Sequence, residues 1–270
     1  MKKIKNLLLL CLSALVLISI IAVYNATQSE TSYHTFNDWR KECKFDYSCA
    51  ISPAPGSEDQ AIRFEWRRED HDGSRSSKSA EYKTKDYTRS RAFRQTREAW
   101  ISFKVYFSSE TLNADSQAMI LTQYHDIPDL HLGEDWRHPI SSLSYVNGKL
   151  KYSYRGDANL VTREEDGERL YTQPSQTFSL GDMQMDQWHR FVYHHKFDIT
   201  GKGILEVWHN GKQYSNSNIV LGYNDQKGPY WKFGAYYYDG WSDYSTRVVY
   251  FSDVKVILGK ASYAEILSLS

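Results

Sequence analysis

One stretch decides the fold of this chain: Ser142-Leu143-Ser144-Tyr145-Val146-Asn147-Gly148-Lys149-Leu150-Lys151-Tyr152-Ser153-Tyr154. The dipeptide Asn147-Gly148 is a strong signal for a two-residue β-hairpin turn, because both turn positions require a positive φ. The flanking segments Ser142–Val146 and Lys149–Tyr154 then become two antiparallel strands. The centre of the chain is therefore predicted to be β-structure.

Strand signals continue on both sides of this hairpin. Apolar residues alternate with polar or exposed ones at Ile62, Phe64 and Trp66, and again at Ile101, Phe103, Val105 and Phe107. Ile204–Trp208 precedes Asn210-Gly211, a second hairpin signal, and Arg247–Leu258 is a further long strand region. Many strands with turn signals between them, little helix and no internal repeat predict an all-β fold, a sandwich of jelly-roll type.

The first residues differ from the rest of the chain. Met1-Lys2-Lys3-Ile4-Lys5 is followed by a nearly unbroken apolar run from Leu7 to Tyr24. This pattern is typical of an export signal or an N-terminal membrane anchor. We expect residues 1–26 to be a signal peptide or anchor, residues 27–34 a tether, and residues 35–270 a single domain. That domain is then secreted, periplasmic, or held facing outward by its anchor.

Within the domain, a short helix is expected from Thr35, its cap, to Cys43, and residues 69–97 and 127–139 are expected to be loops that could wall a cleft. Cys43 and Cys49 are the only cysteines outside the apolar run. In an oxidising compartment they are expected to form a small-loop disulfide. A metal pair is the alternative, and it lacks nearby partner ligands.

Charge is balanced overall but not locally. The formal net charge is zero, which excludes a grossly basic polyanion binder and argues against a nucleic-acid partner. Residues 61–97 nevertheless hold eleven Lys or Arg against six Asp or Glu. This segment is either a solvated surface with salt bridges or a face that binds an anionic ligand. The 21 Tyr and 8 Trp also include candidates for flat platforms under sugar rings.

Two short motifs carry chemically useful side chains. Tyr230-Trp231-Lys232-Phe233-Gly234-Ala235-Tyr236 follows Gln123-Tyr124-His125 by about a hundred residues. On a strand, alternate side chains share a face, so Lys232, Gly234 and Tyr236 lie together, as do Gln123 and His125. Two such strands would present an amide, an imidazole, an ammonium and a phenol to one ligand. Gly234 would let that ligand approach the backbone.

These motifs resemble those of alginate lyases of polysaccharide lyase family seven, whose signatures include Gln-Ile/Val-His and Tyr-Phe-Lys-x-Gly-x-Tyr-Asn-Gln. The stretch from Trp188 to Leu258 is more similar to the heparin lyase I and glucuronan lyase group. The resemblance covers most of residues 60–258. It implies a concanavalin A-like jelly roll and a lyase that cleaves a uronate polysaccharide by β-elimination.

The chain departs from the family-seven pattern at two places. Tyr237 and Tyr238 stand where that pattern has Asn-Gln. The first signature, Arg-Ser/Thr-Glu-Leu/Val-Arg, is degenerate: Ser79-Ala80-Glu81-Tyr82-Lys83 fits with Lys83 in place of the last arginine. Arg63-Phe64-Glu65-Trp66-Arg67 is expected to lie on an earlier strand. The sequence thus leaves the substrate and the identity of the cationic residue open.

The resemblance implies a role for each polar residue. Gln123 stabilises the charge that develops at the substrate carboxylate, and His125 is the base or positions the carboxylate. Tyr236 is the acid, or both acid and base in a syn elimination, and Lys232 supplies it with positive charge or binds substrate. The predicted substrate-binding residues are Lys232, Lys83, Arg67, Arg75 and Tyr230.

The expected partner is an anionic polysaccharide such as alginate, glucuronan or a glycosaminoglycan-like polymer, bound by a monomer without a redox or organic cofactor. Structural calcium is raised by the resemblance alone, with oxygen ligands available from Asp225, Asp239, Asp243 and Asp253. The tandem His194-His195 is expected to be structural, because adjacent strand residues face opposite ways.

The alternative function is a non-catalytic jelly-roll carbohydrate-binding or adhesion protein. A glycoside hydrolase ranks last, since no pair of carboxylates stands out.

Overall fold

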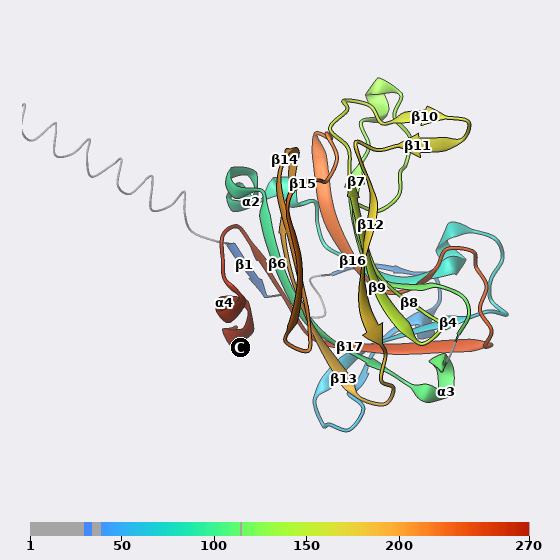
Figure 1. Cartoon of the computed structure of the whole chain (residues 1–270). Coiled ribbons are helices and arrows are strands. Elements are labelled where there is room, and N and C mark those ends of the chain that lie inside the picture. The colour runs from blue at the N-terminus through green and yellow to red at the C-terminus, as the bar shows by residue number, and fades with distance from the viewer. Residues whose placement is uncertain (1–29, 34–38, 114, 270) are drawn as a thin grey trace, which may run out of the picture.

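Two large antiparallel sheets face each other and form nearly the whole molecule (Figure 1). The computed structural model describes residues 30–33, 39–113 and 115–269. We call the sheet that contains β16 (Lys227–Tyr237) the front sheet and the sheet that contains β17 (Thr246–Leu258) the back sheet. This architecture confirms the predicted jelly-roll sandwich.

The front sheet has the strand order β12 (Gln173–Asp182), β9 (Lys149–Gly156), β8 (Ser141–Val146), β7 (Met119–Ile127), β16 (Lys227–Tyr237), β5 (Ser79–Lys83), β2 (Arg40–Cys43). The back sheet has the order β15 (Lys212–Leu221), β14 (Asp198–His209), β13 (Trp188–Lys196), β6 (Glu98–Phe107), β17 (Thr246–Leu258), β4 (Gln60–Arg67), β3 (Cys49–Pro53). Strand β1 (Glu30–Tyr33) pairs with β17, and β10 (Arg163–Glu165) pairs with β11 (Glu168–Leu170).

The helices are short and lie outside the sheets. The α-helices are α2 (Arg91–Thr96), α3 (Ser109–Leu112) and α4 (Tyr263–Ser268). The 3-10 turns are η1 (Asp46–Ser48), η2 (Arg75–Lys78), η3 (Tyr87–Arg89) and η4 (Leu130–Leu132). No helix among the described residues is long and apolar enough to cross a membrane. Residues 1–29, which include the predicted signal or anchor, lie outside the described ranges.

Both predicted hairpins are present. Val146 pairs with Lys149 across Asn147 and Gly148, whose φ values are 50° and 74°. The β14–β15 turn repeats this geometry at Asn210 and Gly211, with φ of 48° and 84°. Positive φ at both turn positions is what a tight turn between right-twisted strands requires.

The aromatic core between the sheets fixes which residues face outward. Phe233 on β16 contacts Phe64 and Phe251 of the back sheet, with ring centroids 5.5 and 5.2 Å apart. Trp231 contacts Phe103 at 5.6 Å. Because Trp231 and Phe233 point inward, their neighbours along β16 point to the outer face of the front sheet.

Three segments differ from the sequence-based predictions. The helix predicted for residues 35–43 is wrong over Arg40–Cys43, which is strand β2; residues 35–38 lie outside the described ranges. Residues 69–97, predicted as a loop, contain strand β5, in addition to η2, η3 and α2. The residues of β5, Ser79-Ala80-Glu81-Tyr82-Lys83, alternate between polar and apolar, so the segment did carry a local strand signal, although its first four residues are all buried. Residues 30–33, within the predicted tether, pair with β17.

The predicted disulfide between Cys43 and Cys49 is present. Cys43 lies on β2 of the front sheet, and Cys49 lies on β3 of the back sheet. The bond therefore joins the edges of the two sheets and anchors β2, a short strand of four residues.

Candidate active site

A row of polar side chains crosses the outer face of the front sheet. Lys232 on β16 pairs directly with Lys83 on one side and with Gln123 on the other. The cross-strand register continues this row in the order Arg40, Lys83, Lys232, Gln123, Ser142, Ser153, Thr177. Directly opposed residues share a face of a sheet. The row is therefore a polar path over seven strands.

The two sequence motifs meet on this face, because β7 and β16 are neighbours. Tyr230 pairs with His125, and Lys232 pairs with Gln123. Tyr236 lies four residues beyond Lys232 and pairs with Ser79 of β5. The amide, imidazole, ammonium and phenol thus occupy one face of the front sheet.

A buried carboxylate, Glu81 on β5, lies at the centre of this group. Its Oε2 is 2.8 Å from Lys232 Nζ and 3.2 Å from Arg75 Nη2. Its Oε1 accepts a hydrogen bond of 2.5 Å from Gln123 Nε2. Burial alone would raise the pKa of Glu81, but Lys232 and Arg75 outweigh it and lower that pKa. Glu81 is therefore an ionised acceptor.

Glu81 also fixes the orientation of the Gln123 amide. A carboxylate can only accept hydrogen bonds, so the NH2 group of Gln123 points to Glu81 and its Oε1 points away. His125 Nε2 lies 3.0 Å from that Oε1, so Nε2 is the ring nitrogen that carries the proton. The Nδ1 atom of His125 then holds the free lone pair, which can accept a proton.

His125 is a neutral imidazole at physiological pH. Burial, followed by the positive charges of Lys232 and Arg75, lowers its pKa to about 3. Tyr230 stacks beside it, with ring centroids 6.1 Å apart. A neutral ring with a free lone pair suits a proton acceptor.

Tyr236 lies under a cation, but that cation is Arg75 and not Lys232. The Arg75 guanidinium carbon is 4.2 Å from the centre of the Tyr236 ring. Burial raises the pKa of Tyr236 above its ordinary value, and Arg75 opposes this rise only in part. Tyr236 is therefore a protonated phenol, and its proton is available for transfer.

Lys232 is less available to a ligand than predicted. Its Nζ lies 2.6 Å from Glu42 and 2.8 Å from Glu81, and its side chain is 4% exposed. The Arg75 side chain, in contrast, is 50% exposed. Arg75 is thus the cation of this group that an incoming carboxylate meets first.

Position 234 requires a glycine, but for a different reason from the predicted approach of a ligand to the backbone. Its φ is 144°, and a Cβ atom there would lie 2.1 Å from the carbonyl oxygen of Ala80 on β5. No side chain fits at that distance. The glycine therefore allows β5 to approach β16, which brings Glu81 next to Lys232.

The remaining predicted substrate-binding residues separate into two groups. Lys83 forms an ion pair with Glu42 and lies 5.6 Å from the Tyr230 ring centre, so both belong to this face. Arg67 does not belong to it: β4 is a back-sheet strand, where Arg67 pairs with Glu65 and covers the Tyr47 ring. Alternation along β4 turns Arg67 outward there, so it lies on the opposite side of the sandwich.

Sequence reasoning gave no role to either carboxylate of this site. Glu81 was visible within the degenerate signature Ser79–Lys83, and its family-like position was a usable signal. Glu42 had no signal, because its contacts with Lys83 and Lys232 join residues far apart in the chain.

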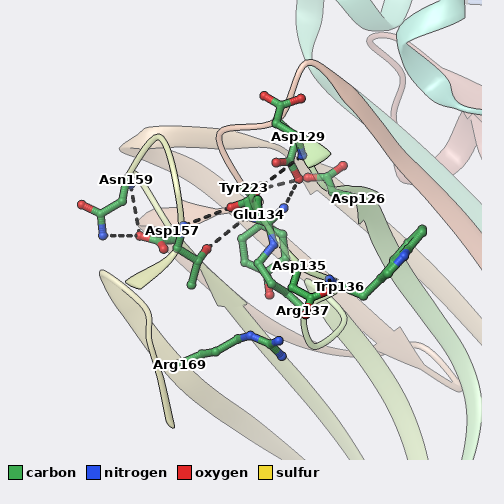
Figure 2. A network of polar contacts seen from close by, with 12 residues as sticks. Asp126, Asp129, Glu134, Asp135, Trp136, Arg137, Asp157, Asn159, Arg169 and Tyr223 are labelled. Carbon is green, nitrogen blue, oxygen red and sulfur yellow. Dashed lines mark hydrogen bonds and ion pairs between the residues drawn. The ribbon is translucent and has the colours of Figure 1, made fainter. Parts of the chain in front are cut away.

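A second buried polar cluster lies beside the end of β7, in the loops that follow β7, β9 and β15 (Figure 2). Arg137 forms ion pairs with Glu134 and Asp225 and donates a 3.0 Å hydrogen bond to Thr162 Oγ1. The Trp136 side chain points away from this cluster and is 51% exposed. The cluster ties the three loops to one another and holds the predicted loop 127–139 in place.

His194 and His195 are structural, as predicted. The His194 ring stacks on Trp100 at 4.0 Å, and His195 is buried between the sheets, 2.9 Å from the hydroxyl of Tyr152. Among the residues that the structure describes, no three His, Cys, Asp or Glu side chains are arranged to hold a metal ion. Two of the aspartates considered for calcium form ion pairs instead, Asp225 with Arg137 and Asp253 with Arg190.

Comparison with known structures confirms the fold. The endo-β-1,4-glucuronan lyase from the fungus Trichoderma reesei is similar with a TM-score of 0.65 and 18% identity, over 89% of this chain and 98% of that chain. The marine PL-14 alginate lyase from Aplysia kurodai is similar with a TM-score of 0.51 and 13% identity, over 78% and 87% of the two chains. No curated protein sequence matches this chain.

Comparison with family models identifies the family. The model described as "Polysaccharide lyase" matches residues 27–255, which include every residue of the site on the front sheet. Because this match spans well over half of the chain, the protein belongs to the polysaccharide lyase family.

Proposed function

We propose that this polysaccharide lyase cleaves a uronate polymer by β-elimination on the outer face of the front sheet. One observation carries the proposal: the protonated phenol of Tyr236 and the neutral imidazole of His125 flank a group of amide and cationic side chains. The reaction removes the C5 proton of a uronate and expels the sugar linked at O4. It therefore needs charge stabilisation at the carboxylate, a base and an acid.

Arg75 and Gln123 would stabilise the substrate carboxylate. The exposed guanidinium of Arg75 can form two parallel hydrogen bonds with a carboxylate. Negative charge moves onto this carboxylate as the C5 proton leaves, so donors placed there act mainly in the transition state. Glu81 holds both Arg75 and Gln123 in position before the substrate arrives.

His125 would accept the C5 proton at Nδ1, and Tyr236 would donate its phenolic proton to the leaving O4. Burial, together with the cations Lys232 and Arg75, lowers the pKa of His125 to about 3. A bound uronate carboxylate adds a negative charge that opposes these cations and makes the imidazole more basic. The base is thus strengthened when substrate is present.

Exposed aromatic rings continue the site beyond Tyr236. Tyr238 is 65% exposed with Lys78 over its ring, and Trp241 is 50% exposed with Arg68 over its ring. A ring paired with a cation can take the apolar face of a sugar and its carboxylate together. These pairs support an acidic polysaccharide as the substrate. Their cations, Lys78 and Arg68, belong to the basic segment 61–97, which would then bind the acidic groups of the polymer.

Glucuronan is the first substrate to test, because the glucuronan lyase from Trichoderma reesei matches over 89% of this chain. Alginate and glycosaminoglycan-like polymers follow. We also propose that the enzyme acts as a monomer outside the cytoplasm; the apolar N-terminal segment and the Cys43–Cys49 disulfide support the location outside the cytoplasm.

The test is incubation of the purified protein with each uronate polymer while the ultraviolet absorbance of unsaturated uronate ends is recorded. We expect absorbance to rise with at least one polymer. Binding without new absorbance on any polymer would identify a carbohydrate-binding protein instead. New reducing ends without absorbance would identify a hydrolase.

A second experiment separates the two proton-transfer roles. His125→Gln removes the base but keeps a polar side chain, and we expect kcat to fall about 100-fold or more. If His125→Gln remained fully active while Tyr236→Phe was inactive, Tyr236 would be both base and acid, and the elimination would be syn.

A further inference from the structure

Five charged side chains on the front sheet form one connected network. Lys232 contacts both Glu42 and Glu81, Lys83 contacts Glu42, and Arg75 contacts Glu81. The network holds three cations and two carboxylates, so one positive charge remains. Without Glu42, the same site would hold two.

Exposure decides which of these charges a substrate meets. The side chain of Arg75 is 50% exposed, that of Glu42 is 30% exposed, and Lys83 is 20% exposed. Glu81 and Lys232 are almost fully buried, at 2% and 4%. Within this network of five residues, the most exposed cation is Arg75 and the more exposed carboxylate is Glu42.

From this arrangement we propose that Glu42 is a specificity-determining residue, which neutralises Lys83 and Lys232 and disfavours sulfated polymers. A uronate with one carboxylate uses the open charge at Arg75. A sugar that also carries sulfate would bring a second negative charge near Glu42. The two lysines there are already neutralised by Glu42, so the network has no unpaired cation to bind the sulfate. The inference rests on the proposed function, since it concerns the same site.

The fold holds Glu42 in this position. Glu42 pairs with Glu81 across the β2–β5 register, and its neighbour Cys43 is bonded to Cys49 of the back sheet. A four-residue edge strand has few other attachments, so the disulfide keeps the carboxylate beside the two lysines. Arg40, which pairs with Lys83, lies farther out on the same strand and is exposed.

The charge on Glu42 persists over the working pH range. Burial would raise its pKa, but Lys232 and Lys83 outweigh this effect and lower the pKa to about 2. The carboxylate is thus ionised at any pH above that value, and it neutralises the lysines at neutral and acidic pH alike.

The back sheet supplies a matched control in Glu65. This carboxylate also lies between two cations, Arg63 and Arg67, but on the opposite outer face of the sandwich. Glu65→Gln and Glu42→Gln make the same chemical change and each leave two cations without their shared partner. Only Glu42→Gln changes the charge at the proposed site.

The experiment uses the full protein, its Glu42→Gln and Glu65→Gln variants, and a uronate polymer before and after chemical sulfation. Equilibrium binding to both polymers is measured first, at several salt concentrations, and elimination is measured second. We expect Glu42→Gln to raise the preference for the sulfated polymer roughly tenfold, with a steeper loss of binding as salt increases. Glu65→Gln should leave both readouts unchanged.

The outcomes separate the two proposals. If Glu42→Gln shifted the sulfated-to-unsulfated ratio no more than Glu65→Gln does, the role of Glu42 would be wrong, whether or not the enzyme cleaves. If no uronate polymer were cleaved, the lyase proposal would fail while the binding ratio still decided the question of Glu42.

Thermal melting shows that each variant is folded. Adding Lys83→Met to Glu42→Gln should remove most of the gained preference, an effect that a purely structural role would not produce.

Discussion

The two outer faces of the sandwich carry similar charges but differ in what those charges contact. On the back sheet, Glu65 lies between Arg63 and Arg67 and forms ion pairs with both. On the front sheet, Glu81 also lies between two cations, but it holds the amide of Gln123 as well. A cluster of ion pairs therefore does not mark an active site. We propose that the active site lies where an ionised carboxylate orients neutral groups that can transfer protons.

The largest expected effect comes from the phenol. Tyr236→Phe removes one hydroxyl group and keeps the ring under Arg75. Because a general acid contributes about 10²- to 10⁴-fold to a rate, we expect kcat to fall within that range while the protein stays folded. Initial rates of absorbance increase measure this loss.

Tyr250→Phe is the matched control on the back sheet. Tyr250 is on β17, and its ring contacts Tyr106 at 6.0 Å. We expect wild-type rates from this variant. Equal losses from the two substitutions would mean that the front face is not the site of the reaction.

Glu81→Gln tests the positioning step directly. The variant keeps the shape of the side chain but removes the ionised acceptor that fixes the Gln123 amide, and it leaves Lys232 with Glu42 alone. We expect kcat to fall about 10- to 100-fold and stability to fall by about 1–3 kcal/mol. Kinetics and thermal melting measure the two losses.

Glu65→Gln should lower stability by a smaller amount and leave kcat unchanged. Its partners Arg63 and Arg67 are 27% and 36% exposed, so water can solvate them once the carboxylate is gone. A loss of kcat in both variants that tracked stability would reduce Glu81 to a structural residue.

Arg75→Ala against Arg67→Ala sharpens the comparison for substrate binding. Arg75 is the half-exposed cation of the site, whereas Arg67 lies on the back sheet over Tyr47. A charge-assisted hydrogen bond contributes about 1.5–3 kcal/mol, so we expect kcat/KM to fall about tenfold or more for Arg75→Ala. Arg67→Ala should leave kcat/KM unchanged. The opposite result would place substrate on the back sheet.

The sequence was sufficient to predict some parts of this site for physical reasons. Alternation of side chains on a strand is local, so Gln123 with His125, and Lys232 with Tyr236, could be placed on common faces from spacing alone. The hairpin at Asn147-Gly148 was equally local. These features need no knowledge of which strands become neighbours.

Other parts depend on long-range pairing and were missed. The burial of Ser79 and Glu81 on β5 depends on contacts with Arg75 and Lys232, which the local alternation of that segment does not show. Arg67 and Arg75 looked equivalent in the basic segment 61–97, since nothing local shows that β4 joins the back sheet. Glu42 reaches its lysines only after β2 has joined the edge of the front sheet.

The smallest expected effect is an absence of titration at His125. Its folded pKa is lowered to about 3, below the ordinary value near 6.5, because burial and then Lys232 disfavour the charged ring. Nitrogen-15 NMR of the free enzyme should show a neutral ring with the proton on Nε2 from about pH 5 to about pH 8. A histidine in a short unstructured peptide, measured in parallel, should titrate near 6.5.

The same shift predicts the direction of a stability change. Below pH 6.5 the unfolded chain binds a proton at His125 while the folded chain does not, so this residue makes stability fall as pH decreases toward its folded pKa. His125→Gln should flatten that part of the melting curve recorded against pH. If the His125 ring instead became charged near pH 6.5, with one proton on each ring nitrogen, the hydrogen bond between Gln123 and Glu81 would not be fixing His125 in its neutral tautomer. The front face would then be one more set of surface ion pairs, like the back face.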